Sequence, residues 1–351
     1  MEEQNQVDAV TLPAQTKKSK GWLWVSVLLI LIIGGYFIWQ QYSSKSDSDT
    51  DTVVEDTATV PSTNSTNTSS TASTAFLADT PISDPSLNWS TMNQGPYADK
   101  VSYATSTDLL NWTDSGTTLA SHASVPDAII KDGTIYAYFV DVTTDGYPEK
   151  LGLITSTDDG KTWSDKQFVE FQGIDGKVPV DPNPYLLSDG RIRLYYFDIG
   201  EARSMMGSKP ATPPTNKIYS AISTDGIHFT AEDGVRFEQQ EIFDPNVIKV
   251  GDTWRLYVGT GSNKVLSATS SDGLTFTYEG VAVDGGAVPD VYYTGEEYIL
   301  YTAGIDIYTS TDGKTFTSTN NSFRSSAGMV TADPGVIKLS DGTYLMVYKT
   351  K

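Results

Sequence analysis

Five aspartates, each beside a proline, recur along the chain, and each opens a short apolar run. They are Asp127, Asp181, Asp244, Asp290 and Asp333, at successive spacings of 54, 63, 46 and 43 residues. Carboxyl groups that lie close together disfavour joint ionisation, so one can stay protonated while its neighbour is ionised. Such a pair can donate a proton and activate a nucleophile in one site. The recurrence therefore predicts acid–base chemistry, provided that the fold gathers these side chains.

A second motif alternates with these aspartates and indicates the elements that position them. It consists of Ser-x-Asp, usually followed by Gly, and of an aromatic residue a few positions later; the copies begin at Ser106, Ser156, Ser223, Ser270 and Ser310. The Ser and Asp side chains can bond their own turn backbone, so we expect these turns to be structural. Two interleaved repeats of this length are typical of small sheets in a radial array. The sequence therefore predicts an all-β, five-bladed β-propeller.

The order of the repeats predicts how the ring closes. The domain starts with a hairpin unit of the second kind (residues 101–112) and ends with an Asp-Pro hairpin (residues 333–349). Pairing these two units in one blade removes two open sheet edges. If the Asp-Pro strand is the innermost of each blade, the five aspartates share one rim of the ring. The Ser-x-Asp turns then lie on the opposite rim or at the periphery.

The Asp-Pro pairs and turns such as Ser106-Thr107-Asp108-Leu109-Leu110-Asn111-Trp112 resemble those of the five-bladed glycoside hydrolases. This group includes the arabinanases and β-xylosidases of family 43, with the invertases and levansucrases as relatives. The resemblance covers about residues 82–351, which is essentially the whole predicted propeller. It implies an enzyme that hydrolyses O-glycosyl bonds, with a glycan or polysaccharide as its partner.

In that family, the resemblance implies three carboxylates in the central funnel. An Asp on the first blade is the base or nucleophile, a second Asp tunes the acid, and a Glu followed by a small residue and Pro is the acid. The first two roles carry over onto Asp127 and Asp244. Counting blades gives Asp290 for the third, and the chain has no Glu-Gly-Pro or Glu-Ala-Pro. The proton donor therefore stays open between Asp290, Glu241 and Glu201.

Further residues of the same rim are expected to bind substrate, namely Asp181, His122, Arg203, Tyr147 and Trp89. For each aspartate of the ring the alternative is structural, because a carboxylate can accept backbone N–H bonds where the strands converge. The two aromatic residues are equally compatible with the blade core, and His122 with a solvated loop. Two His and no Cys leave only oxygen ligands, so we expect no cofactor, and Ca²⁺ is the one plausible ion.

An apolar run from Trp22 to Trp39 predicts a membrane anchor. At about 1.5 Å per residue it spans about 27 Å, close to a bilayer core of roughly 30 Å. Lys17, Lys18 and Lys20 precede it, which favours a cytoplasmic N-terminus in a single-pass plasma-membrane protein with its C-terminal domain outside the cell. A cleaved signal peptide is the alternative, although no small-x-small site follows Trp39. The expected parts are a cytoplasmic tail (1–20), a transmembrane signal anchor (21–42), a Ser/Thr-rich disordered linker (43–80) and the propeller (81–351).

The charge of the chain excludes some partners. The net charge is −20, and residues 76–351 alone hold 20 basic and 36 acidic residues. No basic face is available to neutralise phosphates, so nucleic acid is not an expected partner. We expect a monomer. Two other functions stay open: a non-catalytic propeller that binds polysaccharide or protein, and a sialidase-type enzyme, because Ser156-Thr157-Asp158-Asp159-Gly160-Lys161-Thr162-Trp163 fits the Asp-box pattern.

Overall fold

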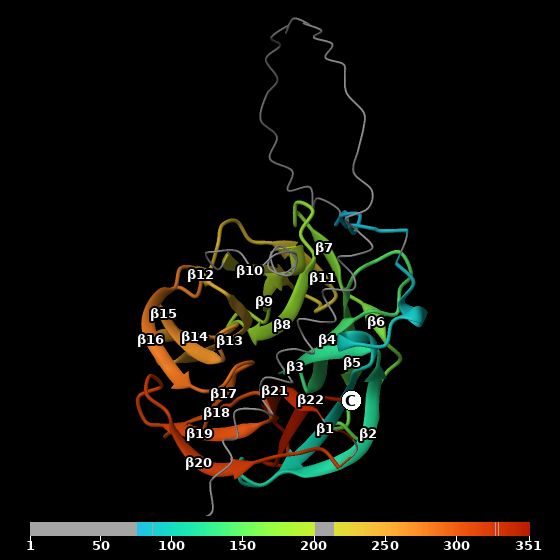
Figure 1. Cartoon of the computed structure of the whole chain (residues 1–351). Helices are drawn as coiled ribbons and strands as arrows, with labels where there is room; N and C mark the ends of the chain where they lie inside the picture. Colours follow the sequence, from blue (N-terminus) through green and yellow to red (C-terminus); the bar gives the residue numbers. More distant parts are fainter. Residues whose placement is uncertain (1–75, 86, 201–213, 327, 329) are drawn as a thin grey trace, which may run out of the picture.

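The computed structural model describes residues 76–351, except residues 86, 201–213, 327 and 329. It consists of five sheets around a common centre (Figure 1), antiparallel except for one strand pair, which confirms the predicted five-bladed β-propeller. Two short 3-10 helices, η1 (Trp89–Thr91) and η2 (Gly95–Tyr97), precede the first strand. The predicted anchor lies outside the described residues. Within them, no helix has the length and apolar character that crossing a bilayer requires.

The blades are numbered from the first complete sheet along the chain. Blade 1 contains β3 (Ala123–Lys131), β4 (Thr134–Asp141), β5 (Lys150–Ser156) and β6 (Gln167–Phe168). Blade 2 contains β8 (Pro179–Leu186), β9 (Ile192–Asp198), β10 (Thr215–Ser223) and β11 (His228–Ala231), with β7 (Glu170–Gln172) and β12 (Phe237–Gln240) added. Blade 3 contains β13 (Ile242–Val250), β14 (Thr253–Thr260), β15 (Lys264–Ser270) and β16 (Thr277–Asp284).

The last two blades complete the ring. Blade 4 contains β17 (Asp290–Tyr293), β18 (Tyr298–Tyr301), β19 (Asp306–Ser310) and β20 (Thr317–Ser322). Blade 5 contains β21 (Thr331–Lys338) and β22 (Tyr344–Thr350) from the end of the chain, and β1 (Lys100–Ser106) and β2 (Thr113–Ser121) from its start. Strands β1 and β22 pair from Lys100↔Thr350 to Ser106↔Tyr344. The predicted closure in one blade is therefore confirmed.

The innermost strands are β3, β8, β13, β17 and β21, and each contacts the next around the axis. They begin on one rim, where the loops between β4 and β5 and between their counterparts also lie. The Ser-x-Asp turns join the third and fourth strands at the opposite rim. In these turns the Ser hydroxyl accepts backbone N–H groups, as Ser223 does from Asp225 at 3.2 Å and Gly226 at 2.8 Å. The structural role predicted for the turns is confirmed.

Buried tyrosines join successive blades. Tyr138, Tyr195, Tyr257 and Tyr301 occupy equivalent positions on the second strands of blades 1 to 4, and all are fully buried. Each hydroxyl donates a hydrogen bond to a turn carbonyl of the next blade, at Gly226, Gly273, Gly313 and Leu109 respectively. In blade 5 the equivalent residue is Val347, which pairs with Gly335 on β21. The junction from blade 5 to blade 1 therefore lacks this bond.

Candidate functional site

The inner strands align on their prolines. In every blade the residue before that proline has a positive φ: Val125 (47°), Asp181 (52°), Asp244 (47°), Val288 (46°) and Asp333 (51°). The strand register shifts at this point in blades 1, 2, 3 and 5, as a β-bulge produces. The residue after the proline forms a second equivalent set: Asp127, Asn183, Asn246, Asp290 and Gly335.

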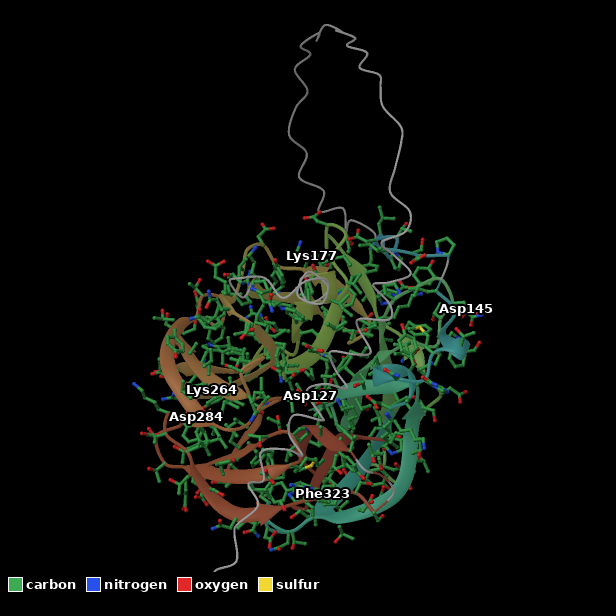
Figure 2. All side chains as sticks on the ribbon, viewed as in Figure 1. Asp127, Asp145, Lys177, Lys264, Asp284 and Phe323 are labelled. Carbon is green, nitrogen blue, oxygen red and sulfur yellow. The ribbon has the colours of Figure 1, made fainter. Side chains whose placement is uncertain are left out.

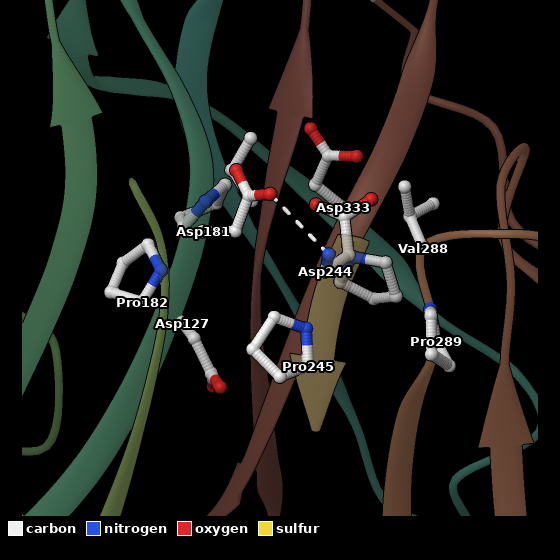
Figure 3. Close-up of a pocket in the computed structure, with 11 residues that line it drawn as sticks. Asp127, Asp181, Pro182, Asp244, Pro245, Val288, Pro289 and Asp333 are labelled. Atoms are coloured by element: carbon white, nitrogen blue, oxygen red, sulfur yellow. Dashed lines mark hydrogen bonds between the residues drawn. The ribbon is translucent and has the colours of Figure 1, made fainter. Parts of the chain in front are cut away.

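The predicted equivalence of five aspartates was therefore wrong. Asp181, Asp244 and Asp333 precede their prolines, whereas Asp127 and Asp290 follow theirs, two residues further along the strand. Successive side chains of a strand alternate between its faces, and the bulge reorients them again. As a result the two groups separate along the axis. In Figure 3 the carboxylates of Asp181 and Asp333 lie at one end, while the Asp127 side chain points toward the other.

The residues after the prolines form a hydrogen-bonded belt between the blades. Asp127 accepts bonds from the Ala128 N–H and the Asn183 side-chain amide, both at 2.6 Å. Asp290 also accepts two hydrogen bonds, from the Asn246 side-chain amide at 2.7 Å and from the Val336 N–H at 3.0 Å. Both carboxylates hence have the partners that a structural role requires. Their predicted catalytic roles gain no support from this geometry.

The residues before the prolines behave differently, because the fold does not need a carboxylate there. Blades 1 and 4 form the same backbone with Val125 and Val288. A β-branched residue is less suited to positive φ than Asp, yet both blades are built. The repeat thus serves as an internal control: the positive φ at this position does not depend on aspartate, so the backbone alone does not account for the aspartates of blades 2, 3 and 5.

These three aspartates meet a buried lysine at the axis. We call Asp181, Asp244, Asp333 and Lys349 the axial mouth, and Figure 3 shows its three aspartates. Asp181 accepts a hydrogen bond from the Asp244 N–H at 3.3 Å, and Lys349 Nζ lies 2.6 Å from Asp333 Oδ2. Asp244 and Lys349 are 9 % exposed and Asp333 is 4 % exposed. Three of the four ionisable groups of the mouth are therefore largely withdrawn from water, and Asp181 is half-buried.

The carboxyl groups of the axial mouth hold protons with unequal strength. Burial raises the pKa of Asp244 well above its ordinary value, and the charges of Asp181 and Asp333 raise it further. Burial also raises the pKa of Asp181, to about 6, against the lowering effect of its bond from the Asp244 N–H. The neighbouring charges thus favour the protonated form of Asp244, whereas the Asp244 N–H favours the ionised form of Asp181. This is the division that a proton donor and its ionised partner require.

The space between the inner strands is small. The cavity lined by the five proline-containing segments has a volume of about 20 Å³, which is enough for roughly one water molecule. In Figure 2 Asp127 lies near the middle of the ring, whereas Asp145 of the β4–β5 loop lies at its outer edge. A larger ligand must therefore meet the carboxyl groups from the rim.

Three of the predicted binding residues lie along the rim of blade 1. The rings of Trp89 and His122 pack with centroids 4.8 Å apart, and His122 Nδ1 lies 2.5 Å from the Tyr97 carbonyl. The Trp89 N–H donates to Asp145 at 3.2 Å, in the loop that also holds Tyr147. Tyr147 lies under the Lys150 ammonium, 3.9 Å from its ring centroid. The structure thus brings Trp89 and His122 into contact.

The candidate proton donors outside the aspartates are placed less directly. Glu241 lies at the rim, directly before β13 and three residues before Asp244. It is half-buried and has a φ of 55°. Its carbonyl accepts a bond from the Gly261 N–H at 3.0 Å. Glu201 and Arg203 lie outside the described residues. Asp333 belongs to the predicted ring of aspartates but was not singled out as a site residue, and Lys349 was missed altogether. The only signal for Lys349 was a lysine at a strand position where blades 1, 2 and 3 have an apolar residue or glycine.

The sialidase-type alternative requires arginines that face the axis, and the described residues show none in the axial mouth. Arg193 pairs with Glu232 and Arg255 with Glu279, at equivalent positions of blades 2 and 3. Arg324 pairs with Asp306. Within the described residues, also, no cluster of three or more His, Cys, Asp or Glu side chains is placed to bind a metal ion.

We expect the free energy of unfolding to fall as the pH rises from about 4 to 7. Burial raises the pKa of Asp127 to about 7 and those of Asp99 and Asp181 to about 6, so over this range the native state holds protons that the unfolded chain releases. Turn carboxylates act in the opposite direction at lower pH: hydrogen bonds lower the pKa of Asp158 to about 2. Urea unfolding midpoints should therefore peak near pH 4.

The negative charge of the whole domain weakens stability in the same pH range, so a variant is needed to assign the effect. Asp99→Asn removes one buried titrating group at 8 % exposure and should make the decline between pH 5 and 7 shallower. Asp252→Asn, in the exposed turn of blade 3, should leave the slope unchanged. Equal slopes in all three proteins, or a stability that rises toward pH 7, would contradict the buried-proton account.

Comparisons with known proteins support the fold. No protein-family model matches the chain, and no curated protein matches its sequence. Among solved structures, an α-L-arabinofuranosidase of family 43 from Clostridium thermocellum is 17% identical, with a TM-score of 0.50 over 64% of this chain and 80% of that one. The Bombyx mori family 32 β-fructofuranosidase is 16% identical, with a TM-score of 0.48. That alignment covers 64% of this chain, which spans about half (54%) of the silkworm protein.

A family 117 glycoside hydrolase of Zobellia galactanivorans is 15% identical, with a TM-score of 0.46 over 65% of this chain and 83% of the other. Likeness at these identities concerns the fold. It confirms, at that level, the predicted resemblance to five-bladed glycosidase propellers.

Proposed function

We propose that this propeller acts on a glycan at the axial mouth and hydrolyses a glycosidic bond there. The observation that carries the proposal is the contact between two axial residues: Asp181 accepts a hydrogen bond from the Asp244 N–H at 3.3 Å, and the charge of Asp181 favours the protonated form of Asp244. Glycoside cleavage needs one protonated carboxyl to protonate the leaving oxygen and one ionised carboxylate to activate water or attack carbon. Asp244 is the proposed donor and Asp181 the proposed ionised partner.

The internal comparison between blades supports the same assignment. The backbone at this position accepts a residue without a carboxyl group, as Val125 and Val288 show. The aspartates of the other three blades are therefore not explained by the backbone alone. Placing three carboxyl groups together at one rim, two of them buried, lowers the free energy of unfolding unless the carboxyl groups are paired with a cation or hydrogen-bonded. Such a cost is accepted where the groups have a chemical role. Asp333 is paired with Lys349, which leaves Asp181 and Asp244 as the groups available for proton transfer.

A second function is favoured by a specific observation. Blade 1 has Val125 where blades 2, 3 and 5 have an axial aspartate, and the cavity of about 20 Å³ does not admit a sugar ring. Both features suit a propeller that binds a glycan at its rim without cleaving it. The contact pair Trp89 and His122 would then supply an aromatic surface for a sugar face.

One assay separates the two functions. The purified chain is incubated with aryl arabinosides, aryl xylosides and fructan, and product release is measured beside retention of the protein on immobilised polysaccharide. The α-L-arabinofuranoside is the first substrate to test, since the Clostridium protein of similar fold acts on that class by its description. Turnover supports hydrolysis, whereas retention without turnover supports the binding function.

We also propose that the domain is held outside the cell by the N-terminal segment. The basic residues before Trp22 and the acidic stretch after Tyr42 support this orientation. Protease added to intact cells should release a fragment that begins between Ser43 and Ala75, detected by N-terminal sequencing. The proposal fails if the linker is cut only after the cells are lysed.

A further inference from the structure

Lys349 departs from the repeat. It pairs with Ala332 on β21, and the equivalent positions of blades 1, 2 and 3 hold Val140, Phe197 and Gly259. A lysine at this place is not required by the strand pairing, since three blades form it with apolar residues or glycine. It is also 9 % exposed, which is rare for a lysine without a specific partner.

The partner of Lys349 is one of the axial aspartates. Its Nζ lies 2.6 Å from Asp333 Oδ2, where the Asp333 side chain is 2 % exposed. The charges of Asp99, before β1, and of Asp244, on β13, also raise the pKa of Lys349, and the charges of Asp333 and Lys349 act on Asp181, on β8. Lys351 is the other nearby cation and acts on Asp99. Burial alone lowers the pKa of Lys349, but Asp333 and Asp99 outweigh it and raise that pKa.

We infer that Lys349 is a positioning residue that neutralises Asp333 and so confines the exchangeable proton of the axial mouth to Asp181 and Asp244. The inference rests on the proposed hydrolysis and deepens it, because it states which groups control the pH range of the site. Without Lys349 the mouth would contain three adjacent carboxyl groups that compete for protons. Joint ionisation would then become more costly for all of them.

The inference predicts opposite effects for the two members of the pair. Lys349→Met leaves Asp333 unneutralised, which should move the acid limb of the rate profile to higher pH by about one unit or more. Asp333→Asn leaves the lysine cation unpaired beside Asp181 and Asp244, which should move that limb to lower pH. The double variant Asp333→Asn/Lys349→Met removes both charges and should return the limb close to its original place.

Two further variants keep the test independent of folding. Lys349→Arg keeps the charge and should keep the original limb. Lys338→Met removes an exposed lysine of the same blade and should change neither the profile nor the stability. A purely structural pair would lower the amount of folded protein in each single variant without moving the limb in opposite directions. That outcome, or a double variant as displaced as Lys349→Met, overturns the inference.

A measurement without substrate separates this inference from the hydrolase proposal. Urea unfolding midpoints of the full chain in detergent are recorded between pH 5 and 8 for the same variants. The decline with rising pH should be steeper for Lys349→Met, shallower for Asp333→Asn and near the original in the double variant, because these are the signs of the altered proton affinities. Absence of turnover in every protein would reject hydrolysis while these slopes still decide the role of Lys349.

Discussion

Replacing Asp244 by Asn is expected to lower glycan turnover by about 10²–10⁴-fold while leaving the fold intact. The substitution removes the proton that Asp244 holds in its buried position, but keeps the size of the side chain. Stability should change little, because burial and the neighbouring charges already favour the uncharged form of Asp244, and an amide is uncharged too. Steady-state rates on an aryl glycoside, measured beside thermal unfolding, check both halves of this prediction.

Two comparison variants make the result specific. Asp252→Asn lies on the same hairpin, in its exposed turn, and should keep the original rate. Asp127→Asn tests the competing assignment of the base to blade 1: the belt geometry predicts a loss of stability, since an amide cannot accept both of the bonds that Asp127 accepts. A large rate loss in Asp127→Asn together with an unimpaired Asp244→Asn would reverse the two roles.

Deleting residues 337–351 is expected to abolish cooperative folding of the domain. The deletion removes β22, which pairs with β1 on one side and with β21 on the other. Leu345, Met346, Val347 and Tyr348 of this strand are at most 1 % exposed. Each large apolar side chain contributes roughly 1.5–3 kcal/mol when buried, so their joint loss is comparable with a typical total stability of about 5–15 kcal/mol. Near-UV circular dichroism and thermal scans report the loss.

The matched control is removal of Lys351 alone, which lies beyond the last strand and should leave the unfolding temperature unchanged. A deletion of residues 337–351 that still unfolds cooperatively, within a few degrees of the full chain, would show that blade 5 does not need the closing strand.

The fold could be predicted from the sequence because the residues of each repeat determine its local structure. The Ser-x-Asp turns specify hairpins through bonds within a few residues, as the Ser223 turn illustrates. The closure could also be predicted, since an incomplete unit at each end leaves only one way to fill the ring. The turns depend on interactions between residues close in sequence, and the closure depends on the number and order of the repeat units.

The site could be predicted only in part. The aspartates were aligned on one another, although the constant residue of the repeat is the proline, and Val125 and Val288 were the visible sign of this. A β-bulge lies between the two positions and changes where each side chain points, and the apolar pattern of the sequence does not reveal it. Lys349 could not be found from local pattern, because its partner Asp333 is brought to it by a bulge.

A closed ring must satisfy a condition that an open row of blades does not: the rotations from each blade to the next have to complete a full circle. Four junctions are set by the same directional tyrosine bond, so any accumulated misfit falls on the fifth. There Val347 offers no hydroxyl, and Gly335 has no side chain where a Cβ would lie 2.6 Å from the Asp127 carboxylate. This junction is held by close contact of the inner strands and by the bond from the Ser340 hydroxyl to Asp159 between the turns of the two blades. No buried tyrosine bond fixes its angle, so this junction can absorb small differences in the rotation between blades.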